Sequence, residues 1–113
     1  MISPTDIRLI KLMIEKCGRL IDICNTYDDK TIQSNYVYSD AIQYEFEKLY
    51  EDTTRLSTEI RITHPEIHFN DLRSIRNRVA HNYESVSLQI LLDTIHNNIP
   101  ILKEDLEKLL NNY

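Results

Sequence analysis

The sequence predicts an all-α protein, an antiparallel bundle of four or five helices that forms a single domain over residues 1–113. Its 113 residues include one Gly and three Pro, which leaves few turn signals for a sandwich or barrel of many strands. Apolar residues recur at spacings of three and four along much of the chain, which is the period of an amphipathic helix. A chain of this length supports one hydrophobic core, and two independent cores would be crowded.

The first expected helix begins at Pro4 and runs to about Asn25. Ser3 is a favourable N-cap, Pro4 suits the first helical position, and Asp6 follows three residues after the cap. The apolar positions that define the buried face of this helix are Ile10, Met13, Ile14, Cys17, Leu20, Ile21 and Cys24.

A loop and a second helix are expected next. Residues 26–35 are polar and rich in turn-forming types, which favours a loop. A helix is expected over residues 39–62, and Pro65 ends this stretch because the residue before a proline is disfavoured in helical geometry. The apolar positions of this helix are Ala41, Ile42, Phe46, Leu49, Leu56 and Ile60.

Shorter helices complete the predicted bundle. One runs to His81 with Asn70 or Asp71 as its cap, and another is capped by Ser85 or Ser87. Residues 97–100, Asn-Asn-Ile-Pro, either kink that helix or begin a fifth one. The inward positions of these last two segments are Leu88, Leu91, Leu92, Ile95, Leu102, Leu106, Leu109 and Leu110.

The cysteines and the termini predict neither a metal site nor a membrane segment. Cys17 and Cys24 lie two helical turns apart, too far for a disulfide, and are expected to be small core residues. The chain has no C-x-x-C motif or Cys/His ligand spacing, so we expect no metal and no cofactor. No apolar run approaches the roughly 20 residues of a membrane span, and no signal peptide is visible, so we expect a cytoplasmic protein.

The charge distribution is uneven. The net charge of −5 argues against binding nucleic acid through bulk positive charge. Arginines are nevertheless concentrated in the middle of the chain, where their planar guanidinium groups suit phosphate, at Arg55, Arg61, Arg73, Arg76 and Arg78. The alternative is an ordinary charged helical surface.

The predicted helix that ends at His81 carries the residues that are candidates for catalysis or binding. On a wheel of 100° per residue, Ile75 and Val79 lie within about 60° of Leu72, and Arg76 lies about 40° from Leu72, beside this buried stripe. An arginine at the core edge should be paired or should line a cleft, because an unpaired buried charge is costly.

Arg76 and His81 together suit phosphodiester cleavage. Histidine can exchange a proton near neutral pH, and a guanidinium can hold charge that develops on phosphate oxygens. Ideal geometry places the two about 140° apart, so either the helix ends near His81 or a second subunit completes the site. The alternative is a structural arginine and a histidine favoured at a helix C-terminus by the macrodipole.

The segment Arg76-Asn77-Arg78-Val79-Ala80-His81-Asn82-Tyr83 resembles the R-x4-H-x-Y motif of the HepT-like branch of HEPN domains. The preceding His64-Pro65-Glu66-Ile67-His68-Phe69 is similar to that family's Pro-Glu-Ile-Pro-Trp segment. Leu49-Tyr50-Glu51-Asp52 resembles its Gly-Glu-Ala segment, with Tyr50 in place of the Gly and Asp52 in place of the Ala. Downstream, Pro100 and Leu102 correspond to its Leu-Pro-x-Leu.

The resemblance implies a HEPN-like bundle and a metal-independent ribonuclease toxin that acts as a homodimer with a composite active site. It implies that Arg76 and His81 are catalytic, with Asn77 and Glu51 as supporting residues. It also implies a nucleotidyltransferase (MNT-type) antitoxin that silences the toxin by adenylylating Tyr83. From its position on the same helix, Arg73 is a candidate RNA-backbone contact. The rival hypothesis is a HEPN module without catalysis that binds a nucleotide or a partner protein.

Overall fold

The structure is a computed structural model that describes residues 2–81 and 85–112, and the all-α prediction is confirmed. No strand occurs within these residues. They form seven helices, of which five are long and two are short: α1 (Pro4–Thr26), α2 (Asp29–Ser34), α3 (Tyr36–Arg55), α4 (Thr58–Thr63), α5 (Phe69–His81), α6 (Ser85–Asn97) and α7 (Ile99–Asn111).

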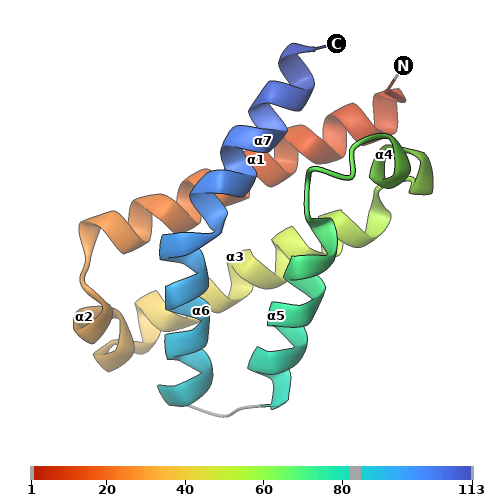
Figure 1. Ribbon diagram of the computed structural model, residues 1–113. Helices are drawn as coiled ribbons and strands as arrows, with labels where there is room; N and C mark the ends of the chain where they lie inside the picture. Colours follow the sequence, from red (N-terminus) through yellow and green to blue (C-terminus); the bar gives the residue numbers. More distant parts are fainter. Residues whose placement is uncertain (1, 82–84, 113) are drawn as a thin grey trace.

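The long helices form an irregular bundle (Figure 1). Helices α1 and α3 run antiparallel through the molecule, α5 and α6 form a second antiparallel pair, and α7 continues upward from α6. Helix α1 packs against α3 and α7, and α3 also packs against α5. The short helices α2 and α4 lie at opposite ends of α3.

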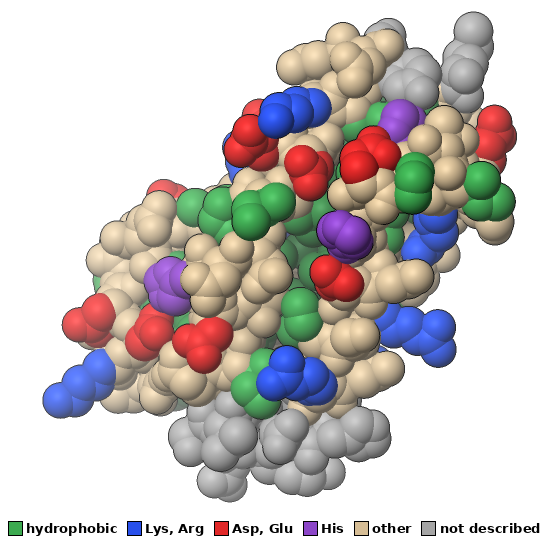
Figure 2. All heavy atoms as spheres, in the orientation of Figure 1, with side chains coloured by type: hydrophobic (Ala, Val, Ile, Leu, Met, Phe, Trp, Pro, Cys, Tyr) green, Lys and Arg blue, Asp and Glu red, His purple; other side chains and the backbone are tan. Residues whose placement is uncertain are grey.

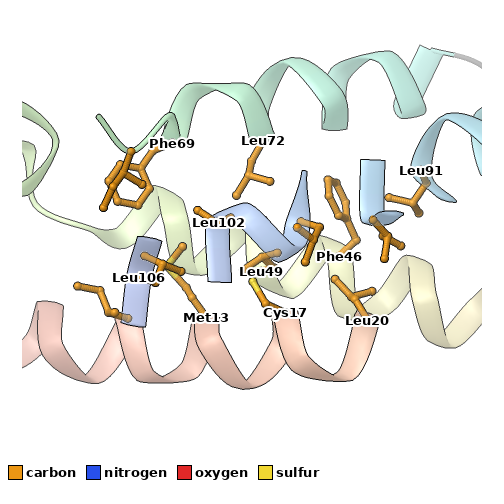
Figure 3. Close-up of a cluster of buried hydrophobic side chains, with 14 of the residues drawn as sticks. Met13, Cys17, Leu20, Phe46, Leu49, Phe69, Leu72, Leu91, Leu102 and Leu106 are labelled. Carbon is orange, nitrogen blue, oxygen red and sulfur yellow. The ribbon is translucent and has the colours of Figure 1, made fainter. Parts of the chain in front are cut away.

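The core forms where the apolar faces of these helices meet (Figure 3). Met13, Cys17 and Leu20 of α1 point toward side chains from the other long helices. Helix α1 begins as predicted, since the Ser3 hydroxyl accepts a hydrogen bond of 3.1 Å from the Asp6 backbone N–H. Of the residues predicted to point inward, those fully buried include Ile10, Met13, Leu20, Ile42, Leu49, Leu91, Leu92, Ile95 and Leu106.

The prediction of a continuous loop over residues 26–35 is wrong, because this segment contains α2. The Asp28 carboxylate caps α2 by accepting a hydrogen bond of 2.8 Å from the Thr31 N–H. Ile32 supplies the buried contact that holds this short helix on the bundle. A six-residue helix is too short to show apolar periodicity, so the capping residue Asp28 is the signal in the sequence that marks it.

The predicted helix over residues 39–62 is also wrong in its bounds. It begins earlier, at Tyr36, because the Asn35 side chain caps it, and it stops at Arg55. Ser57 then caps the separate helix α4, and the buried Asp6 carboxylate accepts hydrogen bonds from the Ser57 N–H (3.0 Å) and hydroxyl (2.5 Å). A contact across 51 residues therefore fixes the break.

The later helices resolve the alternatives left by the sequence. Helix α5 begins at Phe69, so the two predicted caps, Asn70 and Asp71, lie inside it, and that prediction is wrong. Helix α6 begins at Ser85, so Ser85 and Ser87 also lie inside their helix and do not precede it as caps. Helix α7 is a separate fifth long helix that begins at Ile99, with Pro100 in its first turn. No helix of the described ranges is long and apolar enough to cross a membrane.

Both cysteines are buried thiols, as predicted. Burial raises the pKa of Cys17 to about 12 and that of Cys24 to about 11. Both thiols therefore stay protonated at neutral pH and act as core side chains.

An ion pair between Lys16 and Asp52 connects α1 to α3. The two side chains are 14% and 7% exposed, so the pair lies largely away from water. Asp52 is the residue that replaces Ala in the resembling segment, and Lys16 provides its counter-charge from 36 positions away. Such a pair adds little net stability, although it holds α1 and α3 in one relative position. Removing one partner leaves the other as an unpaired buried charge, which is costly.

We expect the two halves of this pair to differ when mutated. Lys16→Met should lower the free energy of unfolding by about 3 kcal/mol, because the buried Asp52 carboxylate loses its partner. Asp52→Asn should cost only about 1 kcal/mol, because the amide oxygen still accepts a hydrogen bond and the lysine stem can extend toward solvent. Urea unfolding followed by circular dichroism measures both, and equal losses would contradict this interpretation.

Candidate functional site

Helix α5 is held on the bundle by residues at its start and on its inner face. Leu72 is 3% exposed, and Figure 3 shows it and Phe69 pointing from α5 into the core. Arg61 of α4 connects this region to α3, since its guanidinium lies 5.9 Å from the Phe69 ring centroid and donates a hydrogen bond to the Thr53 carbonyl. The orientation of α5 is therefore determined by these contacts and not by its polar residues.

Arg76 lies at the edge of the α5–α3 contact, as the helical wheel predicts. Its side chain is 40% exposed, so it is neither buried nor freely extended. The guanidinium carbon lies 5.4 Å from the centroid of the Tyr50 ring, and Nη2 lies 3.6 Å from Oε1 of Glu47. Both contacts come from α3, where Glu47 and Tyr50 are three residues apart.

Glu51, predicted as a supporting residue, has a different ionic partner. Its carboxylate lies 3.3 Å from Nζ of Lys48, and the backbone carbonyl of Glu51 accepts a hydrogen bond from the Thr54 hydroxyl. Glu51 follows Glu47 by one helical turn, so it lies on the same side of α3 as the Arg76 contacts. Its carboxylate is thus adjacent to the site and engaged by Lys48.

Two further polar residues of α5 were predicted to belong to the site. Arg73 and Asn77 are both exposed, in keeping with their predicted positions four residues apart on one flank. Both side chains are therefore accessible to a ligand that reaches Arg76 from solvent.

Two of the predicted site residues cannot be placed relative to Arg76. The backbone of His81 closes the range of α5, but its side chain lies outside what the structure describes. Tyr83 lies outside the described residues altogether. Whether Arg76 and His81 meet thus stays a prediction from the sequence.

A hollow of about 170 Å³ lies on another side of α5, between α5 and α7. Figure 2 shows this side of the molecule, where apolar side chains are bordered by acidic side chains and a histidine. The lining residues include Leu72, Ile101 and Asp105, and Arg76 is not among them. A larger hollow of about 280 Å³ at the start of α1 is lined in part by Asp6, whose carboxylate already accepts hydrogen bonds from Ser57, the cap of α4. Neither hollow brings together residues of the R-x4-H segment.

The Arg76 arrangement is suited to binding an anionic oxygen. Stacking on an aromatic ring occupies the face of a guanidinium and leaves its N–H groups directed outward in the plane. Among the described residues, no group of three or more His, Cys, Asp or Glu side chains could hold a metal ion. A phosphate at this position would interact with the arginine N–H groups.

Sequence reasoning missed Glu47 as a partner of Arg76 and did not assign Tyr50 to it. The available signal was an acid and an aromatic residue three apart, which lie on neighbouring positions of one helix. That signal is weak without the register of α3 against α5. Only the packed structure shows which turn of α3 faces Arg76.

The chain resembles known proteins at the level of a family. A family model described as ribonuclease HepT-like matches residues 13–109, which extends from within α1 to the last turns of α7. The matched range includes Arg76, His81 and Tyr83. No solved structure matches the chain.

Leu72 should determine whether α5 stays in place. Leu72→Ala removes a side chain that is 3% exposed, and we expect a loss of about 3 kcal/mol in the free energy of unfolding. Arg73→Ala, one residue away and exposed, should change it by no more than about 0.5 kcal/mol. Chemical denaturation compares the two, and similar losses would show that α5 is not anchored through Leu72.

Proposed function

This chain belongs to the HepT-like ribonuclease family of the HEPN superfamily, and from that premise we propose that it cleaves RNA as the toxin of a toxin–antitoxin pair. The single observation that carries the proposal is the placement of Arg76. Its guanidinium is partly exposed, supported by an aromatic ring, and five residues before a histidine on the same helix. A protein that only binds partners has no need of this pair.

The proposed mechanism divides the chemistry between Arg76 and His81. His81 removes the proton from a ribose 2′-hydroxyl, and the 2′-oxygen then attacks the adjacent phosphorus. The bond from phosphorus to the 5′-oxygen breaks, and the partner subunit's His81 gives this oxygen a proton. Arg76 stabilises the negative charge on the phosphate oxygens in the transition state. The products are a 2′,3′-cyclic phosphate and a 5′-hydroxyl, and no metal takes part.

A homodimer supplies the second motif in this proposal. On an ideal helix Arg76 and His81 lie about 140° apart, and in this proposal a second copy supplies the missing member of the pair to the same phosphate. Two copies of α5 that face each other would provide two arginines and two histidines. Asn77 and Glu51 would support this composite site, and the exposed Arg73 would contact the RNA backbone.

Silencing is proposed to occur at Tyr83. An MNT-type nucleotidyltransferase antitoxin would transfer AMP from a nucleotide to the phenolic oxygen and release pyrophosphate. Tyr83 follows His81 by two residues, so the new phosphate would lie close to the catalytic pair. It would compete with RNA for the arginines, which explains inhibition without any change in fold. The same proposal places both proteins in the cytoplasm, where RNA is available.

The decisive test is cleavage of cellular RNA in the presence of EDTA by protein purified without antitoxin. Arg76→Ala and His81→Ala should each lower the rate by about 10²- to 10³-fold, because each removes a group that acts in the transition state. Arg8→Ala, which removes an exposed arginine from α1, is the charge-matched control and should cleave like the wild type.

An RNA strand carrying 2′-O-methyl groups should resist cleavage, since it lacks the nucleophile. Intact mass must first show that Tyr83 carries no nucleotide. Unmodified wild type that fails to cleave would favour the non-catalytic binding module. If Arg76→Ala and His81→Ala both cleave RNA as fast as the wild type, the cleavage depends on other residues.

A further inference from the structure

Helix α3 surrounds the Arg76 guanidinium with two different groups. Tyr50 is partly buried and packs against the hydrophobic core, so its ring has a fixed position. The Glu47 side chain is 45% exposed, so its carboxylate is in contact with water. One helix therefore offers Arg76 a fixed apolar face and a solvated charge.

The two contacts of the Arg76 guanidinium differ in kind. An aromatic ring attracts the cation through its face, whereas a carboxylate interacts with the N–H groups around its edge. A phosphate oxygen would use these same N–H groups and would leave the ring contact undisturbed. Glu47 is thus a competitor of phosphate, and Tyr50 is not.

The ion pair with Glu47 is weak enough to be displaced. Its N–O separation of 3.6 Å exceeds that of a good hydrogen bond, and both side chains are about half exposed. Exposed pairs of this kind contribute little and are screened by salt. A phosphate that arrives with its own charge can therefore take the place of the carboxylate.

We propose that Tyr50 is a positioning residue that holds Arg76 for an RNA phosphate, and that Glu47 occupies the phosphate position until RNA displaces it. The inference rests on the proposed ribonuclease function and assigns roles to two residues that the R-x4-H-x-Y motif does not contain. Tyr50 supports the cation in the free and bound states. Glu47 lowers the affinity for RNA and neutralises Arg76 when no RNA is bound.

The chain provides a matched control for this arrangement. Lys48 lies 5.4 Å from the Tyr44 ring centroid and pairs with Glu51, so a second cation rests on a tyrosine beside a carboxylate. All three of these residues belong to α3, whereas the ion pair and the aromatic contact of Arg76 are with Glu47 and Tyr50. Tyr44→Leu removes an aromatic ring at the same distance from a cation without touching Arg76.

The first measurement detects the contact in the free protein. The Arg76 Nε–Hε signal, followed by NMR at mildly acidic pH, should carry a ring-current shift from Tyr50. Tyr50→Leu should abolish this shift, whereas Tyr50→Phe and Tyr44→Leu should preserve it. An Arg76 signal that is the same in wild type and Tyr50→Leu overturns the proposal, whatever the protein does to RNA.

The second measurement is the affinity for single-stranded RNA with 2′-O-methyl riboses at low ionic strength. Tyr50→Leu should weaken binding by about two- to five-fold, as expected for an exposed cation–aromatic contact, and Tyr50→Phe should restore it. Glu47→Gln should tighten binding by about two-fold. In an Arg76→Ala background neither change should have an effect, because both act through Arg76.

The outcomes separate this inference from the ribonuclease proposal. If wild type cleaves RNA but the Tyr50→Leu variant binds RNA as well as wild type does, the positioning role is overturned. The same holds if Tyr50→Leu weakens RNA binding as much in the Arg76→Ala background as it does in the wild type. Unchanged binding in Glu47→Gln overturns the role of Glu47. If the NMR shift is present but wild type neither binds nor cleaves RNA, the proposed function fails and the phosphate role fails with it.

Discussion

The rotation of α3 between α1 and α5 is the constraint on which the candidate site depends. Ile42, Phe46 and Leu49 are buried in the core, and their burial fixes which way every other residue of α3 faces. Asp52 is thereby directed toward α1, where it meets Lys16, while Glu47 and Tyr50 are directed toward α5. The residues that build the core thus also decide what surrounds Arg76.

Local signals in the sequence predicted the fold class and the long helices. The Ser3 cap, the apolar spacing along α1 and the position of Arg76 beside Leu72 all depend on neighbours within a few residues, and the structure has each of them. Two errors, the missed α2 and the late start of α3, concern local caps, and the third involves a contact over a long distance. Apolar periodicity continues through Ser57, but Ser57 caps α4 and is held at the break by the Asp6 carboxylate, 51 residues earlier.

For the candidate site, too, the sequence predicted what depends on one helix and missed what depends on the packing of two helices. The wheel placed Arg76 at the core edge because that depends on one helix alone. It could not identify Glu47 and Tyr50 as its neighbours, because this requires the register between two helices separated by a turn and a short helix. The two departures from the family's Gly-Glu-Ala segment are explained only by this packing. The Tyr50 ring contacts the Arg76 guanidinium, and Asp52 forms an ion pair with Lys16 of α1.

The pair of Lys16 and Asp52 also constrains the order in which such a protein could have changed. A variant with alanine at position 52 would accept a lysine at position 16 at little cost, because the long side chain can carry its charge toward solvent. Aspartate arriving first would have been enclosed without a counter-ion, at a cost comparable to much of the stability of a small domain. Introducing an aspartate at position 52 would therefore cost least in a chain that already carries Lys16, and replacing the pair would cost least if the aspartate were changed first.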